Sequence, residues 1–106
     1  MENSTNKGVI MKHSKYLKVL GKRIKVIFRD MTEENVCGHY LYSQKLIEIN
    51  NTLDPLTQQV TLLHELVHAV FDRAGIHSAN VSHDIEEVIA DQVSKVILEN
   101  FKLTRL

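Results

Sequence analysis

The chain has 106 residues, 43% of them hydrophobic and 25% charged, and its formal net charge at pH 7 is zero. This length and composition fit one ordinary globular domain. No apolar run approaches the ~20 residues that a membrane-spanning helix needs, and the polar first residues lack the apolar stretch of a secretory signal. Cys37 is the one cysteine, which excludes an internal disulfide. Together these features favour a cytoplasmic protein.

The two ends of the chain differ in charge. Residues 1–30 hold eight basic and two acidic groups, a net charge of +6. The remaining five basic and eleven acidic groups give residues 31–106 a net charge of −6. A basic segment can contact nucleic acid, and such binding would depend steeply on salt. No recognition-helix pattern accompanies the charge, so we interpret it as the solvated face of a strand.

The first part of the chain predicts a leader and then a strand. Residues 1–12 are polar, and we expect a flexible leader there, followed by one domain over residues 13–106. Residues 13–20 are ambiguous and are interpreted as a short helix. Residues 22–29 alternate apolar and polar side chains, which predicts a strand.

Two further short strands are predicted before the long helices. They cover residues 36–42 and 46–50, and the polar residues 43–45 separate them. Two short strands joined by a polar turn indicate a hairpin.

Asp54 and Pro55 mark the start of a long helix. Asp54 can accept hydrogen bonds from free backbone N–H groups, and proline suits the first helical position. The helix is expected to run to about Ala74, because Gly75 tolerates the positive φ of a helix end. Its core face is predicted from five apolar residues at helical spacing: Val60, Leu63, Val67, Val70 and Phe71.

A second long helix is predicted from His83 to about Phe101, after a loop over residues 76–81. Ser82 can cap its first turn. Six apolar residues predict its buried stripe: Ile85, Val88, Ile89, Val93, Val96 and Ile97. Strands followed by two long helices indicate an α+β fold, in which a small antiparallel sheet packs on the helices.

The first helix carries His64, Glu65 and His68 in the pattern H-E-x-x-H. Residues four apart lie on the same face of a helix, so both imidazoles can bind one metal ion. Glu65 lies beside them and can act as a general base. Half-buried histidines without partners would cost free energy, and a bound metal removes that cost. The pattern therefore predicts a catalytic Zn²⁺ site.

The third metal ligand is expected on the second helix, because catalytic zinc usually has three protein ligands and a water. Glu87 and Asp91 lie four residues apart on one face. We expect Glu87 to bind the metal, and Asp91 to accept a hydrogen bond from the outer nitrogen of a liganding histidine. Glu86 lies about 100° around the helix and is expected to face solvent. It is the alternative ligand if the helix phase differs.

A peptidase also needs a donor for the oxyanion that develops on the substrate carbonyl. The sequence leaves five candidates open: His39, Tyr40, Tyr42, His77 and His83. Cys37 is expected to be a small strand residue, with an inhibitory fourth zinc ligand as the alternative.

Two stretches resemble the gluzincin pattern of zinc metallopeptidases, H-E-x-x-H followed by E-x-x-x-D. They are Thr61–Ala69 and Glu86–Asp91. Gly38-His-Tyr and Leu46–Asn50 are similar to the strands that precede the motif helix in minimal zinc peptidases, including the ImmA/IrrE-type enzymes and small phage-encoded relatives. The resemblance covers roughly residues 22–100.

The resemblance implies a zinc metallopeptidase of bacterial or phage origin that hydrolyses peptide bonds. Its zinc ligands would be His64, His68 and Glu87, with Glu65 as the general base. A protein or peptide substrate would align by strand addition to one strand of the hairpin.

Two rival functions fit the same residues. A metal-stabilised binding or regulatory module would use the same ligands without turnover, leaving Glu65 idle. A protein ligand such as Cys37 or His83 in the fourth coordination position would indicate that module, whereas water there supports catalysis. A nucleic-acid-binding accessory would use the basic first part of the chain.

Overall fold

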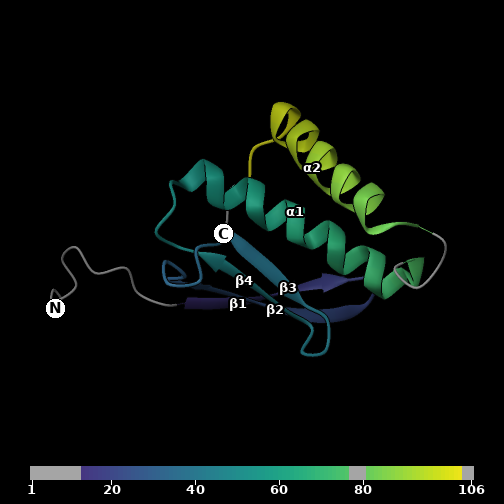
Figure 1. Ribbon diagram of the computed structural model, residues 1–106, viewed down its shortest axis with the longest axis horizontal. Coiled ribbons are helices and arrows are strands. Elements are labelled where there is room, and N and C mark those ends of the chain that lie inside the picture. Colours follow the sequence, from purple (N-terminus) through teal and green to yellow (C-terminus); the bar gives the residue numbers. More distant parts are fainter. Residues whose placement is uncertain (1–12, 77–80, 104–106) are drawn as a thin grey trace, which may run out of the picture.

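The computed structural model describes residues 13–76 and 81–103. The elements are β1 His13–Val19, β2 Lys22–Arg29, β3 Gly38–Leu41, β4 Leu46–Asn50, α1 Pro55–Ala74 and α2 His83–Asn100. In that part of the chain α1 lies on one face of a four-stranded sheet, and α2 packs against α1 (Figure 1). The expected α+β class is confirmed. The expected leader over residues 1–12 and the candidate donor His77 lie outside the described residues.

The segment interpreted as a short helix is strand β1, so that prediction is wrong. It pairs antiparallel with β2 along its length. Leu20 and Gly21 connect the two strands with φ values of 50° and 82°, as a two-residue hairpin turn of type I′ requires. Pairing with β2 and burial of Val19 decide the conformation, because a short segment has little helical stability of its own.

The sheet has the strand order β1-β2-β4-β3. β3 and β4 pair antiparallel, which confirms the predicted hairpin. β2 and β4 pair in parallel, so the sheet is mixed where an antiparallel one was expected. The chain leaves β2, returns along β3 and reverses again, and β4 therefore runs in the direction of β2. β3 is left as an edge strand of the described sheet.

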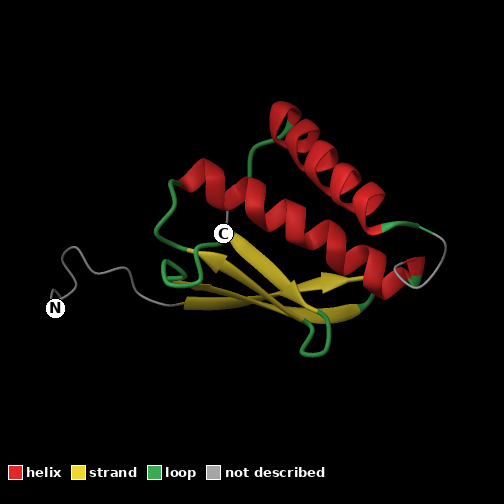
Figure 2. Ribbon diagram, viewed as in Figure 1, coloured by secondary structure: helices red, strands yellow, loops and turns green. Residues whose placement is uncertain are grey.

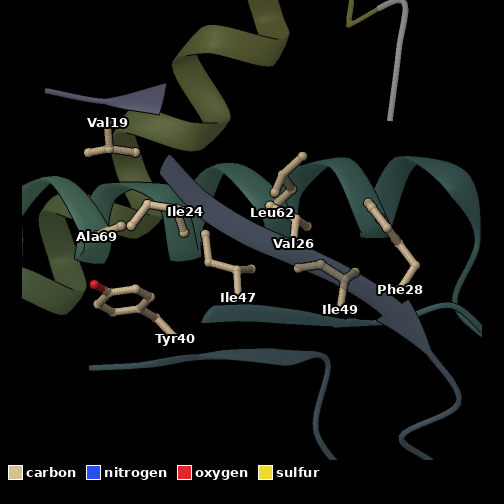
Figure 3. Packing of buried hydrophobic residues seen from close by; sticks show 9 residues of the cluster. All are labelled: Val19, Ile24, Val26, Phe28, Tyr40, Ile47, Ile49, Leu62 and Ala69. Atoms are coloured by element: carbon tan, nitrogen blue, oxygen red, sulfur yellow. The ribbon is translucent and has the colours of Figure 1, made fainter. Parts of the chain in front are cut away.

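The core lies between the sheet and α1 (Figures 2 and 3). Ile24, Val26 and Phe28 alternate along β2 and are fully buried, as are Ile47 and Ile49 on β4. Parallel pairing sets Val26 beside Ile47 and Phe28 beside Ile49 on the same face. Each such side chain contributes about 1.5–3 kcal/mol through burial. This packing holds α1 at a set height above the sheet.

Helix α1 begins and ends where the sequence predicts. The side chain of Asp54 accepts a hydrogen bond from the backbone N–H of Thr57 at 3.0 Å, and Gly75 ends the helix with a φ of 78°. The predicted core face differs from the buried one, because the sheet covers one side of α1 and α2 covers another (Figure 2). Val70 is 37% exposed, and the buried residues are Thr61, Leu62, His68 and Ala69.

Helix α2 turns a different face inward from the one predicted. Its buried residues are Glu86, Ala90 and Ser94, and it packs mainly against α1. Small side chains on this face let the two helices approach closely. Five residues of the predicted buried stripe are between 37% and 62% exposed: Ile85, Val88, Ile89, Val93 and Val96. Neither described helix has the length and apolar character needed to cross a bilayer.

Candidate metal centre

His64, His68 and Glu87 converge at the interface of α1 and α2. The two oxygens of Glu87 lie 3.0 Å from Nε2 of His64 and 3.0 Å from Nε2 of His68. The two Nε2 atoms lie 3.3 Å apart. The structure thus brings the three predicted ligands together, in an arrangement that could hold a metal ion.

The spacing of these nitrogen and oxygen atoms fits zinc. Zinc binds imidazole nitrogen and carboxylate oxygen at about 2.0–2.1 Å, and a tetrahedron of such bonds has edges of about 3.3 Å. Each Nε2 atom lies 3.0 Å from a different oxygen of Glu87, and the two Nε2 atoms lie 3.3 Å apart, so these separations are close to those edges. Two imidazoles and one carboxylate are also a donor set of catalytic zinc sites, which keep the fourth position for water.

Glu86 lies on the far side of the His68 ring from Glu87. Its carboxylate forms a hydrogen bond with Nδ1 of His68, and the hydroxyl of Tyr42 lies 3.4 Å from the same carboxylate oxygen. Glu86 is 2% exposed. The predicted solvent-facing position is therefore wrong, because the phase of α2 turns Glu86 toward α1.

Asp91 does not take the role predicted for it. Its carboxylate accepts hydrogen bonds from Lys95 at 3.1 Å and from Gln92 at 3.0 Å, both exposed. Asp91 lies five residues beyond Glu86, about 140° around the helix. Glu86 instead accepts the hydrogen bond from the outer nitrogen of a liganding histidine candidate, Nδ1 of His68.

Glu65 lies at the meeting point of two hollows. A cleft of about 270 Å³ is lined by Glu65 together with His68, Glu87, Tyr42 and His83, and by Gly38, His39 and Tyr40. A second hollow of about 230 Å³ is lined by Glu65, His64, Cys37, Val60 and Thr61. Burial raises the pKa of the Glu65 carboxyl, and the neighbouring histidines partly oppose that rise.

Strand β3 borders the cleft because it lies along α1. Gly38 packs so closely on Thr61 that an added Cβ would lie 2.7 Å from Cγ2 of Thr61. Further along, the hydroxyl of Tyr40 donates to Asp72 at 2.6 Å. Glu65 lies between these two contacts along α1, so the edge strand passes alongside the predicted ligands His64 and His68.

A comparison with protein families identifies the group to which this fold and site belong. The model of a peptidase family described as the IrrE N-terminal-like domain matches residues 21–96, from the start of β2 well into α2. The chain belongs to this family. The match includes the H-E-x-x-H helix and Glu87, and membership implies a peptidase-type domain. No curated protein and no solved structure gives a significant match.

The described candidates for an oxyanion donor in this IrrE N-terminal-like domain differ in their exposure and hydrogen-bond partners. His83 lines the cleft with its side chain 73% exposed, and its Nε2 lies 3.6 Å from Glu87. Tyr42 also lines the cleft, but its hydroxyl contacts Glu86 and burial raises its pKa to about 12. The other two described candidates, Tyr40 and His39, hydrogen-bond Asp72 and Glu48.

Proposed function

We propose that this IrrE N-terminal-like domain is a zinc-dependent metallopeptidase of the gluzincin type. The observation that carries the proposal is the convergence of His64, His68 and Glu87, whose two oxygens each lie 3.0 Å from one Nε2 while the two Nε2 atoms lie 3.3 Å apart, beside Glu65 in a cleft. His64, His68 and Glu87 are the proposed zinc ligands, and Glu65 is the proposed general base. The substrate is a peptide bond in a protein or peptide.

The chain's own residues supply the proton transfers of such a reaction. Zinc in this site would activate a water by lowering its pKa towards ~7 and would polarise the substrate carbonyl. Glu65 accepts the proton of the attacking water and delivers it to the leaving amine. His83, exposed in the same cleft, donates a hydrogen bond to the oxyanion.

The edge position of β3 supports an extended peptide as the substrate. In the described sheet β3 pairs only with β4, so its outer edge can accept another strand. Strand addition gives affinity through main-chain hydrogen bonds that do not depend on the substrate side chains. A peptide added there would pass Glu65, because Gly38, His39 and Tyr40 line the same cleft.

One observation favours a second function, a metal-stabilised binding module. The 3.6 Å between Nε2 of His83 and Glu87 places an imidazole close to the proposed ligands. If His83 bound the metal as a fourth protein ligand, the site would be closed to water and Glu65 would have no substrate proton to move.

Metal analysis combined with a proteolysis screen tests the proposal. We expect one zinc per chain in the wild type, in Glu65→Gln and in the control Glu99→Gln, which makes the same chemical change on the exposed side of α2. Cleavage of a peptide library should fall about 10²- to 10⁴-fold in Glu65→Gln alone. Equal cleavage by wild type and Glu65→Gln would overturn the assignment of the base. Bound zinc without any cleavage would favour the binding module.

A further inference from the structure

Consecutive residues of α2 contact opposite edges of one imidazole ring. Glu87 lies 3.0 Å from Nε2 of His68, and Glu86 hydrogen-bonds Nδ1 of the same ring. Both glutamates lie on the first turns of α2, so their relative positions are set by the helix backbone. The ring of His68 is 7% exposed and the side chain of Glu86 is 2% exposed.

The contact with Glu86 determines which nitrogen of His68 faces the proposed metal. A carboxylate accepts hydrogen bonds, so Nδ1 of the ring is the donor and Nε2 presents a lone pair. That lone pair faces a carboxylate oxygen of Glu87 at 3.0 Å and Nε2 of His64 at 3.3 Å. A cation placed among these electron-rich atoms is the ligand that such an arrangement favours.

A purely structural role explains Glu86 poorly. Burying a carboxylate costs free energy unless it is paired, and an apolar residue at this position of α2 would avoid the cost. The surrounding contacts are specific: Nδ1 of His68 on one side and the hydroxyl of Tyr42 at 3.4 Å on the other. Tyr42 comes from the sheet side of the cleft, so elements on both sides hold the carboxylate in place.

We propose that Glu86 is a positioning residue of the metal centre. It holds the imidazole of His68 with Nε2 directed at the metal, and Tyr42 holds the carboxylate of Glu86. This inference rests on the proposed function, because it assumes that His64, His68 and Glu87 bind the ion. The role differs from that of Glu87, since Glu86 acts through His68.

Metal affinity of two matched variants tests the inference. Glu86→Gln and Asp91→Asn both change a carboxylate into an amide on the same helix, but only Glu86 contacts His68. Zinc affinity is measured by competition with a chromophoric chelator, and the visible absorption of bound Co²⁺ reports the coordination geometry. We expect about 10- to 100-fold weaker zinc binding and an altered Co²⁺ spectrum in Glu86→Gln. Asp91→Asn should bind within about twofold of the wild type.

A second variant keeps the test decisive if Glu86→Gln folds poorly. Tyr42→Phe removes only the hydroxyl next to Glu86 and keeps the aromatic ring beside Tyr40. We expect its zinc affinity to fall about two- to fivefold, as for one lost hydrogen bond. The positioning role is overturned if Glu86→Gln folds and binds zinc as tightly as the wild type. If Glu86→Gln does not fold, wild-type zinc affinity in Tyr42→Phe overturns it. An equal loss of zinc affinity in Asp91→Asn also overturns it. A wild type that binds no zinc would instead refute the proposed function itself.

Discussion

The Nε2 atoms of His64 and His68 lie 3.3 Å apart, on two rings that project from successive turns of α1. The two residues are four apart in the sequence, so both rings lie on the same side of α1. The convergence also involves Glu87 from α2, which lies 3.0 Å from each ring. The proposed site is therefore a junction between two helices, and its occupation should affect stability as well as catalysis.

Zinc should stabilise the fold because it would link α1 to α2. At free zinc a thousandfold above the dissociation constant, the free energy of unfolding should rise by about 4 kcal/mol. Thermal unfolding followed by circular dichroism, with and without a chelator, measures this change. Glu87→Ala, which removes the carboxylate ligand proposed on α2, is the control. An equal zinc-dependent shift in that variant would show that the ion binds elsewhere.

The variant His83→Ala should distinguish the proposed peptidase from the metal-stabilised binding module. As an oxyanion donor His83 contributes only to the transition state, so kcat should fall by about 10²-fold while zinc affinity stays within about twofold. Asp84→Ala is a suitable comparison, because Asp84 is exposed on the same turn of α2 and is not among the residues that line the cleft, so this variant should leave kcat unchanged. A parallel loss of zinc affinity in His83→Ala would make His83 a metal ligand and support the module.

Acid should weaken the sheet through Glu48. Hydrogen bonds from Arg29, and then from His39, hold the pKa of the Glu48 carboxyl below its usual value. The folded pKa is depressed, so the contribution to stability is complete above the unfolded pKa of about 4.3 and is lost as the pH falls through the folded pKa. Glu48→Gln should lower the free energy of unfolding by about 1–2 kcal/mol at pH 7, and the difference from wild type should shrink towards pH 3.

Urea unfolding at pH 7, 5 and 3 checks the Glu48 prediction. Glu34→Gln is its control, because Glu34 shares Arg29 but is 41% exposed, and its effect should be smaller. A difference between wild type and Glu48→Gln that is the same at all three pH values would contradict the role of the carboxylate charge.

Gly38 is where the edge strand comes closest to α1, and a larger residue should disrupt that contact. An added Cβ would lie 2.7 Å from the carbonyl oxygen of Glu48 and 2.7 Å from Cγ2 of Thr61. Gly38→Ala should cost about 1–3 kcal/mol of unfolding free energy, measured by urea denaturation. Adding Thr61→Ser removes one of the two clashes and should restore part of the loss. No recovery in the double variant would place the strain at the backbone oxygen alone.

Local features of the sequence predict α1 well. Asp54 and Pro55 act within the first turn of the helix and Gly75 acts within its last, so no distant residue is needed to set its bounds. The pairing of His64 with His68 is equally local, since it follows from the pitch of the helix. The hairpin of β3 and β4 is confirmed for the same reason, because a short polar turn joins adjacent strands.

Non-local pairing of strands explains why two features of the sheet were predicted wrongly from the sequence. Residues 13–19 form a strand through hydrogen bonds to β2, and β4 lies parallel to β2 because the chain reverses at β3. Neither arrangement leaves a signal within a short window. Apolar periodicity in α2 likewise did not reveal its buried face, since Ile85 and Val88 are more than half exposed.

By itself the sequence determined the two helices and the histidine pair, because these follow from interactions within a few residues, and the ligand count of catalytic zinc pointed to an acidic partner on the second helix. Only the tertiary structure decided which acidic residue faces which atom: Glu87 lies at Nε2 of His68, Glu86 at Nδ1, and Asp91 at the surface with Lys95. The physical reason is the packing of α2 on α1 through Ala90 and Ser94. The rotation of one helix against another depends on how side chains fit across the whole contact.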